Sequence, residues 1–473
     1  MSQLPQQEPD VLIYPLRGSH RTGRCVAEPL VSMPWGGAYV GYDDEKLVIE
    51  RPWFDTTPVF ISVKDGCARL ARRWSALAPF AEVDLNYVQD YLRYQTPFTQ
   101  RTFCSGVAMV RNGERWSISG NQYFNVGTSP ISEPPDQNLL VILEREIVAA
   151  GADAVFHLSS GLDSSLLAII ARRLFPKVRA ATFRTRGRGA SQELDVVQTL
   201  AEQFDIELET YDLTEIDLWK EGINLAHDAL PYPIAHPSHL ARYLLDRRLA
   251  ETAAKTIVTG RGPDEFLGGY EVHGPEFENP DAYNRRITCT SEAWIGKLFQ
   301  SPRPSETQVE RSRLIENGKL SLAMRLRHDL HATFEAWNMI DIGFARCLRV
   351  RYVNPFLAAD AATLMFSRPD HDKFFDGSSK NYLRRNFAKY YPDYLLQNPK
   401  MGLTIDIREY LDGESVASIV RRLCDGSSFG QRFLRREAIS ALVEDTLSGR
   451  ANYGWQIWSL YLCQVTYAKL FHD

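Results

Sequence analysis

Residues 154–175 read AVFHLSSGLDSSLLAIIARRLF, and this stretch decides the fold. The apolar run 154–158 has the composition of a short buried strand, whereas 166–175 has the apolar spacing of a helix. Between them stands SSGLDSS, a turn of small polar residues. A buried strand that passes through such a turn into a helix begins a βαβ unit, so the stretch predicts a parallel sheet.

The same alternation continues along the chain. The strand-like runs VRAATF (178–183), ELETYDL (207–213) and TIVTG (256–260) are separated by helical patterns at 191–204 and 239–253. The sequence therefore predicts an α/β fold, and ligands of such sheets bind at the carboxyl ends of the strands. From about Ser305 onward the pattern is mostly helical, and YGWQIWSLYLCQVTY near the end predicts a packed terminal helix.

The first part of the chain has a different texture. Short runs such as AYVGY, KLVIE, PVFISV and GVAMV are punctuated by Gly, Asp and Asn, which is typical of a small, mainly antiparallel domain. A proline-rich stretch, Gly127 to Gln137, separates this region from the βαβ region and has the composition of a linker. We therefore expect two domains, at 1–130 and 138–473.

Bulk composition excludes some classes of function. The 473 residues carry a net charge of −5 and are 44% hydrophobic, which gives no basic footprint for nucleic acid and favours a small-molecule or peptide substrate. The chain has no run of eighteen apolar residues and its start has no signal-peptide pattern, so we expect a cytoplasmic protein without a membrane role. The seven cysteines are scattered without a C-x-x-C pair and are expected to be free thiols.

The loop Ser159–Ser165 carries the strongest functional signal. Backbone N–H groups of a tight Ser/Gly turn, together with the positive end of the following helix, form a cradle for phosphate oxygens. No lysine follows the glycine, so the loop differs from the G-x-x-x-x-G-K-[ST] type. The alternative is a structural turn in which Ser or Asp caps the helix.

A second segment, TGRGPDEFLGGY (259–270), also follows an apolar strand and also brings a carboxylate to a strand's carboxyl end. Asp163 and Asp264 are therefore expected to converge on one ion. Mg²⁺ prefers one or two carboxylates completed by water and phosphate oxygens, so this pair predicts a magnesium site.

These segments resemble the asparagine synthetase family, within the PP-loop ATP pyrophosphatases. SSGLDSS is similar to the family's S-G-G-x-D-S loop and TGRGPDEFLGGY to its S-G-E-G-A-D-E-x-x-G-G-Y segment, while KNYLR (380–384) and NPKMG (398–402) resemble its K-x-x-L-R and R-x-K-x-G segments. The resemblance spans about residues 138–420. It implies that ATP and Mg²⁺ are the cofactors and that the backbone near Leu158 and Phe183 holds adenine. It also implies that Lys400 stabilises the charge that develops at the reacting acyl centre. The site residues expected from the loop and the resemblance together are Leu158, Ser159, Ser160, Gly161, Leu162, Asp163, Ser164, Phe183, Arg184, Gly260 and Gly262 for nucleotide, Asp163 and Asp264 for metal, and Lys400, Arg261 and Lys380 for catalysis.

The chain also departs from the family's pattern. Members that use glutamine begin Met-Cys, because the cysteine is the nucleophile that releases ammonia, whereas this sequence begins Met1-Ser2. Its first 130 residues resemble only the later part of the glutaminase domain, which implies a degenerate domain kept for structure. The amine is then expected to arrive with the substrate, as in the related β-lactam synthetases and lasso-peptide cyclases.

Arg261 stands where asparagine synthetases have a glutamate and β-lactam synthetases a tyrosine that acts with a downstream glutamate as base. A guanidinium with a pKa above about 12 cannot serve as a base. The segment expected to supply the partner glutamate, AWNMID, offers Asn338 and Met339, with Glu335 and Asp341 nearby. Arg261 is a candidate to bind a substrate carboxylate, or alternatively to hold Glu265 or a backbone carbonyl.

Two further groups of residues carry weaker signals. In the loop FRTRGRGASQE, Arg184 is the arginine we favour for contact with phosphate or a substrate carboxylate, although basic loops are often only solvated. His227, His236 and His239 lie among prolines that break a regular ligand spacing, so packing or capping is favoured over a metal role.

Together these features predict an AMP-forming amide ligase that adenylates a carboxylate and couples it to an amine, with intramolecular ring closure in natural-product biosynthesis as the favoured case. A peptide substrate would imply a precursor-peptide-processing partner. The alternatives are an ammonia- or partner-fed asparagine synthetase relative, or a catalytically silent homologue that binds nucleotide or a protein. Because Asp163 and Asp264 are both present, the sequence favours an active enzyme over a catalytically silent homologue.

Overall fold

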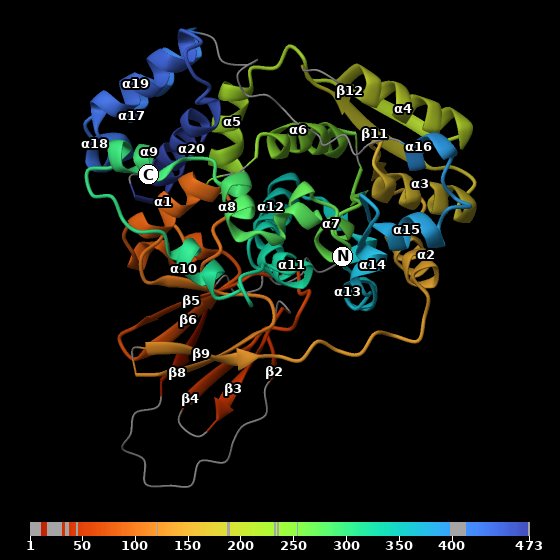
Figure 1. Cartoon of the computed structure of the whole chain (residues 1–473), viewed down its shortest axis with the longest axis horizontal. Coiled ribbons are helices and arrows are strands. Elements are labelled where there is room, and N and C mark those ends of the chain that lie inside the picture. Colours follow the sequence, from red (N-terminus) through yellow and green to blue (C-terminus); the bar gives the residue numbers. More distant parts are fainter. Residues whose placement is uncertain are drawn as a thin grey trace, which may run out of the picture.

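The computed structural model describes residues 11–16, 31–33, 37–43, 46–120, 122–186, 190–230, 233, 236–252, 254–397 and 413–471. Within these ranges the chain forms two regions, an antiparallel β region at the bottom of Figure 1 and a larger helix-rich α/β region above it. No helix among the described residues is long and apolar enough to span a membrane. The six described cysteines are all free, as the sequence predicts.

The N-terminal region consists of two antiparallel sheets that face each other. Alternating apolar residues from both sheets, such as Ile49, Ile61, Val110 and Trp116, fill a common core. The predicted strands are therefore present and antiparallel. One sheet has the order β1 (Val11–Pro15), β6 (Cys67–Ala71), β5 (Val59–Lys64), β7 (Val107–Val110), and the other β2 (Val31–Ser32), β3 (Tyr39–Asp43), β4 (Lys46–Glu50), β8 (Glu114–Ser119), β9 (Gln122–Thr128).

The second region is built on a parallel sheet of five strands, which confirms the predicted βαβ alternation. Successive residues of a strand point to opposite faces, so Phe156 packs under α2, α3 and α4 while Val155 packs under α6. The last strand, β14, is not among the predicted ones. The sheet order is β12 (Glu207–Asp212), β11 (Arg179–Arg184), β10 (Val155–His157), β13 (Thr256–Val258), β14 (Arg351–Val353), and the four helices are α2 (Leu139–Ala150), α3 (Leu162–Leu174), α4 (Ala190–Gln203) and α6 (Ser238–Glu251).

The rest of the described chain is mostly helical, as predicted. The terminal helix α20 is buried along most of its length and packs against α1 and α5, so helices from both ends of the chain share one core (Figure 1). The remaining elements are η1 (Trp74–Phe80), α1 (Leu85–Tyr94), α5 (Leu218–Asp228), α7 (Pro263–Phe266), η2 (Glu271–His273), η3 (Pro275–Glu278), α8 (Pro280–Ile287), α9 (Glu292–Leu298), α10 (Glu306–Ser312), α11 (Leu322–His331), α12 (Thr333–Leu348), η4 (Pro355–Leu357), α13 (Ala359–Phe366), α14 (Asp370–Lys373), β15 (Phe374–Phe375), β16 (Ser378–Ser379), α15 (Asn381–Asn386), α16 (Asp393–Gln397), α17 (Gly413–Leu423), α18 (Phe429–Phe433), α19 (Arg436–Leu447) and α20 (Gly454–Phe471).

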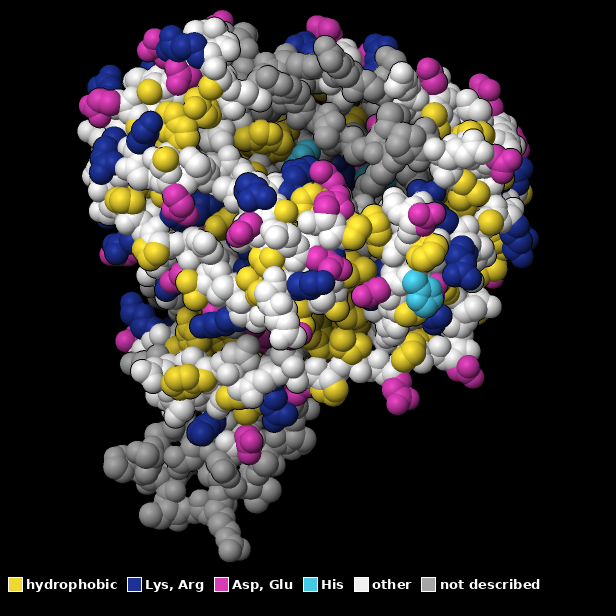
Figure 2. Space-filling view, viewed as in Figure 1, with side chains coloured by type: hydrophobic (Ala, Val, Ile, Leu, Met, Phe, Trp, Pro, Cys, Tyr) yellow, Lys and Arg dark blue, Asp and Glu magenta, His cyan; other side chains and the backbone are white. Residues whose placement is uncertain are grey.

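Surface charge follows the composition. On the face shown in Figure 2, basic and acidic side chains are interspersed rather than gathered by sign. A face of this kind offers no basic stripe that would follow a nucleic-acid backbone.

A buried ion pair joins the two regions. Arg51, just after β4, donates from Nη1 and Nη2 to the two carboxylate oxygens of Glu335 on α12, at 2.8 and 3.0 Å. Asn112 donates to the same carboxylate from its backbone and its side chain, at 3.0 and 2.7 Å. The side chains of Arg51 and Glu335 are 0% and 1% exposed, so the pair is shielded from water and fixes α12 against the β region.

We predict that Arg51→Ala destabilises the protein by about 3–5 kcal/mol, because the change leaves the carboxylate of Glu335 buried without its guanidinium. The matched control is Arg115→Ala: Arg115 is exposed and lies 3.4 Å from the half-buried Glu50, so its loss should cost less than about 1 kcal/mol. Denaturant unfolding measures both. Equal small losses for the two variants would contradict the role given to this ion pair.

Candidate active site

The loop between β10 and α3 has the shape of the predicted phosphate cradle. Gly161 is the N-cap of α3 and forms no side-chain cap, so no capping side chain occupies the N–H groups of the first turn. Ser164 Oγ accepts from the backbone N–H of Ser159 at 3.1 Å and shares a hydrogen bond with its Oγ at 2.8 Å. Ser165 Oγ donates to Ser159 O at 3.2 Å. The serines therefore hold the loop in shape, while the helix end directs its positive dipole at the cavity.

Asp163 and Asp264 converge, as the sequence predicts. The ammonium of Lys380 pairs with Asp163 Oδ2 and, at 2.7 Å, with Asp264 Oδ1. Burial by itself would lower the pKa of Lys380, but the charges of the two aspartates outweigh this effect and raise the pKa, so the lysine stays charged. The two carboxylates thus face a single point beside the phosphate loop.

The backbone at Lys380 is strained. This residue is the N-cap of α15 with φ 54° and ψ 37°, the left-handed conformation that a non-glycine residue adopts at a cost of about 1–2 kcal/mol. Strain of this kind persists only where the surroundings hold it, and it is concentrated at functional sites. The ion pairs with Asp163 and Asp264 supply such a hold.

Glycines allow the elements to approach this point. A Cβ atom on Gly260 would lie 2.8 Å from Ser164 N, so the loop after β13 can touch the start of α3 only with glycine there. A Cβ on Gly269 would collide with Asp264 Oδ1 and Lys380 Cε and would lie 2.8 Å from Asp264 Cα. Gly262 has φ +119°, which side chains other than glycine avoid. These three positions explain why the segment after β13 is rich in glycine.

A cavity of about 580 Å³ opens over the phosphate loop, within the size range of small-molecule sites. Ten residues of the predicted site line it: Leu158, Ser159, Gly161, Asp163, Ser164, Phe183, Gly260, Arg261, Gly262 and Asp264.

The other predicted residues are not among the residues that line the cavity. Leu162 packs in the hydrophobic core, and Ser160 is buried and donates to the carboxylate of Glu193. Arg184 is half exposed and pairs with Asp212 on the neighbouring strand, outside the cavity lining. Lys380 is buried under the two aspartates, and Lys400 falls outside the described residues, so its role stays a prediction.

Arg261 is held by α12. It pairs with Asp341, and its Nη2 donates to Asn338 Oδ1 at 3.1 Å, while its guanidinium lies 5.3 Å from the ring centre of Trp337. Glu265 instead accepts from the Tyr270 hydroxyl at 2.7 Å. Of the carboxylates near the position where the family keeps its base, Asp341 is therefore bound to an arginine, and Glu335 is bound to Arg51.

Several residues of the site were missed by sequence reasoning. His157 Nε2 and Asp246 Oδ1 lie 2.6 Å apart, and the Tyr352 hydroxyl donates to Asp246 Oδ2 at 2.5 Å. Arg242 on α6 lies 2.6 Å from Asp341 Oδ1 and 3.4 Å from Asp246 Oδ2. In the sequence, Arg242 and Asp246 belong to a helix with many charges, which gives no signal that these two are buried.

His236 and His239 are packed among aromatic side chains. Burial lowers the pKa of His236 to about 4, and the pKa of His239 lies well below its usual value because of burial and the charges of neighbouring groups. His239 packs edge-on to Trp337, with ring centres 4.1 Å apart. No group of three or more His, Cys, Asp or Glu side chains suited to a metal occurs in the described part of the chain. The side chain of His227 lies outside that part.

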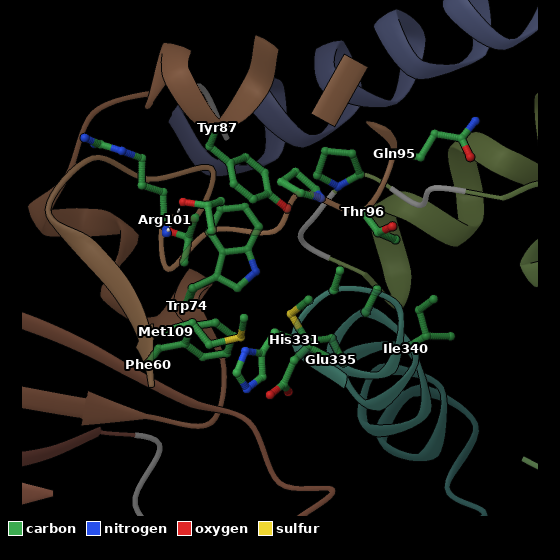
Figure 3. Close-up of a pocket in the computed structure, with 17 residues that line it drawn as sticks. Phe60, Trp74, Tyr87, Gln95, Thr96, Arg101, Met109, His331, Glu335 and Ile340 are labelled. Atoms are coloured by element: carbon green, nitrogen blue, oxygen red, sulfur yellow. Dashed lines mark hydrogen bonds between the residues drawn. The ribbon is translucent and has the colours of Figure 1, made fainter. Parts of the chain in front are cut away.

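A second, smaller cavity of about 40 Å³ lies between the two regions. Figure 3 shows Phe60, Trp74 and Met109 of the N-terminal region facing His331 and Glu335 of the helical region across it. It shares Gln95, Thr96 and Ala336 with the lining of the larger cavity, so the two adjoin.

Comparison with known proteins adds to this geometry. The sequence model of the asparagine synthase family matches residues 145–470, which include both segments that form the cradle and the carboxylate pair. The chain is similar to glutamine-hydrolyzing asparagine synthetase 1 of Bacillus subtilis (strain 168), with 22% identity over an alignment that covers 81% of this chain and 68% of the relative. It is also similar to a protein of Mycobacterium bovis provisionally named as a glutamine-hydrolyzing asparagine synthetase, with 21% identity over an alignment that covers 96% of this chain and 79% of the relative.

We predict that Gly269→Ala weakens Mg²⁺-dependent binding of α,β-methylene ATP by roughly tenfold or more, since overpacking costs about 1–3 kcal/mol and here it displaces Asp264 and Lys380. The control is Gly296→Ala on α9, where a Cβ meets no atom within 4 Å. Calorimetric titration measures the affinity, and circular dichroism checks that both variants fold. Wild-type affinity in Gly269→Ala would contradict the packing described for this site.

Proposed function

Because the chain belongs to the asparagine synthase family, we propose that it is an ATP-dependent carbon–nitrogen ligase that activates a carboxylate as its acyl adenylate and transfers the acyl group to an amine. The observation that supports this most is the convergence of Asp163 and Asp264 beside the cradle at the start of α3. A carboxylate is a poor electrophile, whereas a mixed anhydride with AMP has a good leaving group.

The residues fit a magnesium–pyrophosphate group. Two carboxylates that face one point, next to open helix N–H groups, match the preference of Mg²⁺ for one or two carboxylates and phosphate oxygens. When bound, the ion would neutralise the charge that develops on the phosphates. Ser159, Gly161 and Ser164 would hold the β- and γ-phosphate oxygens, and Asp163 and Asp264 would hold the ion. The ammonium of Lys380, which pairs with both aspartates in this structure, would then move onto a phosphate and add positive charge there.

The adenine and acyl parts would occupy the rest of the cavity. Leu158 and Phe183 line it at the carboxyl ends of β10 and β11, where the expected adenine position lies. Arg261, which cannot accept a proton, lines the same cavity and would serve substrate binding rather than base catalysis.

The N-terminal region bears on the source of the amine. Of its described cysteines, Cys104 is buried, and burial raises the pKa of its thiol to about 12, so it is no nucleophile at neutral pH. We therefore propose that the amine arrives with the substrate and that the reaction closes a ring in natural-product biosynthesis, in the manner of a β-lactam or lasso-peptide macrolactam; an enzyme fed with ammonia by a partner is the alternative.

We predict that turnover releases AMP and pyrophosphate, measured by ³¹P NMR, because the cradle and the aspartates suit cleavage between the α- and β-phosphates. Asp163→Asn and Asp264→Asn keep the shape of the side chain but remove a charge at the metal position, so each should abolish AMP formation in a folded protein. Asp153→Asn, at an exposed position before β10, is the control and should retain it. ADP and phosphate as products, or an active double variant, would refute the mechanism.

We also predict that glutamine is not the nitrogen donor. With glutamine labelled with ¹⁵N in its amide group, the amide product should carry no label, since the thiol of Cys104 is buried and burial raises its pKa. Release of glutamate at the rate of product formation would contradict this, whereas incorporation of added ammonium would favour the ammonia-fed alternative.

A further inference from the structure

A histidine at the end of β10 is held at the larger cavity by a buried carboxylate. His157 stands just before the phosphate loop and lines the cavity together with Ser159. Its Nε2 lies 2.6 Å from Asp246 Oδ1 on α6, and the side chain of Asp246 is 0% exposed. The proposed adenylation step uses neither side chain, so the pair is available for the step that follows it.

The neighbours of Asp246 determine which nitrogen of His157 carries the proton. The Tyr352 hydroxyl donates to Asp246 Oδ2 at 2.5 Å, and Arg242 Nε lies 3.4 Å from the same oxygen. Burial and the charge of Asp246 raise the pKa of Tyr352, so this hydroxyl keeps its proton. The other oxygen, Oδ1, accepts from His157, so Nε2 of the neutral imidazole carries the proton and Nδ1 carries the lone pair.

The lone pair on Nδ1 is open to the cavity. Among the described residues Nδ1 has no hydrogen-bond partner, and it does not belong to the buried polar atoms that lack one. The side chain of His157 is 16% exposed, and the residue lines the larger cavity. An imidazole that is oriented by a buried carboxylate, with its other nitrogen open to a reaction cavity, is arranged as a general base is, and the carboxylate stabilises the imidazolium that forms.

Other groups of the cavity lining are less suited to accept a proton. Burial lowers the pKa of His236 and His239, so both resist protonation. Glu193 and Glu265 each accept a hydrogen bond from a protein hydroxyl. Glu265 is the competing candidate, because burial and the charge of Asp264 raise its pKa to about 7.

We propose that His157, held by Asp246, is the general base of the amide-forming step. The amine nitrogen forms a bond to the acyl carbon of the adenylate and passes a proton to His157 Nδ1. The bond from the acyl carbon to the phosphate oxygen breaks, AMP leaves with that electron pair, and the imidazolium then gives its proton to water in the cavity. This inference rests on the proposed function, which supplies the acyl adenylate, and it assigns the base that Arg261 cannot provide.

The position of His157 is tested with 5′-O-bromoacetyladenosine, whose alkylating carbon takes roughly the place of the acyl carbon of an adenylate. Nδ1 should form a bond to this carbon and displace bromide. Peptide mapping by mass spectrometry should find the adduct on His157, and Mg²⁺ with α,β-methylene ATP should block it. His371, which is exposed and does not line the cavity, is the control and should react at a rate that the nucleotide leaves unchanged.

The role of Asp246 as a positioning residue is tested by the nitrogen that reacts. In Asp246→Asn, Arg242 and Tyr352 favour the amide oxygen on their side, so the amide nitrogen donates to His157 Nε2 and the ring proton moves to Nδ1. Labelling at Nδ1 should then fall by roughly tenfold or more. Hydrolysis of the adduct and chromatography against the two carboxymethylhistidine isomers identify the nitrogen.

The catalytic role is tested by acyl transfer from acetyl adenylate, which needs no adenylation step. His157→Gln should slow transfer to methylamine by roughly a hundredfold or more. Transfer to hydroxylamine, a stronger nucleophile that is unprotonated at neutral pH, should fall much less. The affinity for α,β-methylene ATP, measured by calorimetry, should not change. His236→Gln, at another histidine of the same cavity, is the matched control and should keep the rate of the wild type.

Three results would overturn the inference. Labelling that the nucleotide blocks could fall on a residue other than His157, His157→Gln could transfer acetyl to methylamine as fast as the wild type, or His157→Gln could fold but lose nucleotide affinity, which would assign the histidine to ATP. If only Glu265→Gln loses transfer to methylamine, Glu265 is the base instead. Labelling uses the wild type, so it decides the matter even if His157→Gln does not fold. The proposed function fails separately, through the identity of the phosphorus products.

Discussion

The ion pairs of Lys380 with Asp163 and Asp264 are the constraint on which the site depends. Three charges that are far apart in the sequence meet in a place that is largely closed to water, and each would be costly to bury alone. The arrangement requires glycine at 260 and 269 and a left-handed backbone at Lys380. The parallel sheet contributes by ending β10 and β13 side by side, so the loops that carry the aspartates begin at the same edge.

Helix α12 connects this site with the N-terminal region. Trp337 of this helix lines the larger cavity, and Asn338 and Asp341 bind Arg261. Glu335, on the same helix, binds Arg51 at the smaller cavity. The β region therefore stabilises the position of the helix that forms part of the wall of the larger cavity. This gives the N-terminal region a structural role that needs no chemistry of its own.

Sequence reasoning recovers the parts of this architecture that local pattern determines. Apolar runs followed by polar turns identify four of the five parallel strands, and the convergence of Asp163 with Asp264 follows from strands that end at one edge. Strand β14 was missed because it has only three residues and follows a long helix, and three residues are too few to show the alternation of apolar and polar side chains that indicates a strand. The sequence does not predict the partners of Arg261 or the burial of Arg242 and Asp246. Charged residues of a helix are usually exposed, so their burial depends on tertiary packing that the local pattern does not contain. Lys380 was found through resemblance alone, since its position between the aspartates depends on contacts between distant segments.

The central claim is that Asp163 and Asp264 form one cation position that serves a nucleotide. Crystals grown with Mn²⁺ and α,β-methylene ATP test it directly, because the anomalous signal of manganese locates the ion. We expect a peak between the two carboxylates, in contact with phosphate oxygens that lie against the start of α3, and we expect the Lys380 ammonium to have moved from the carboxylates onto a phosphate. A manganese peak elsewhere, with Lys380 still between Asp163 and Asp264 and the nucleotide bound, would contradict it.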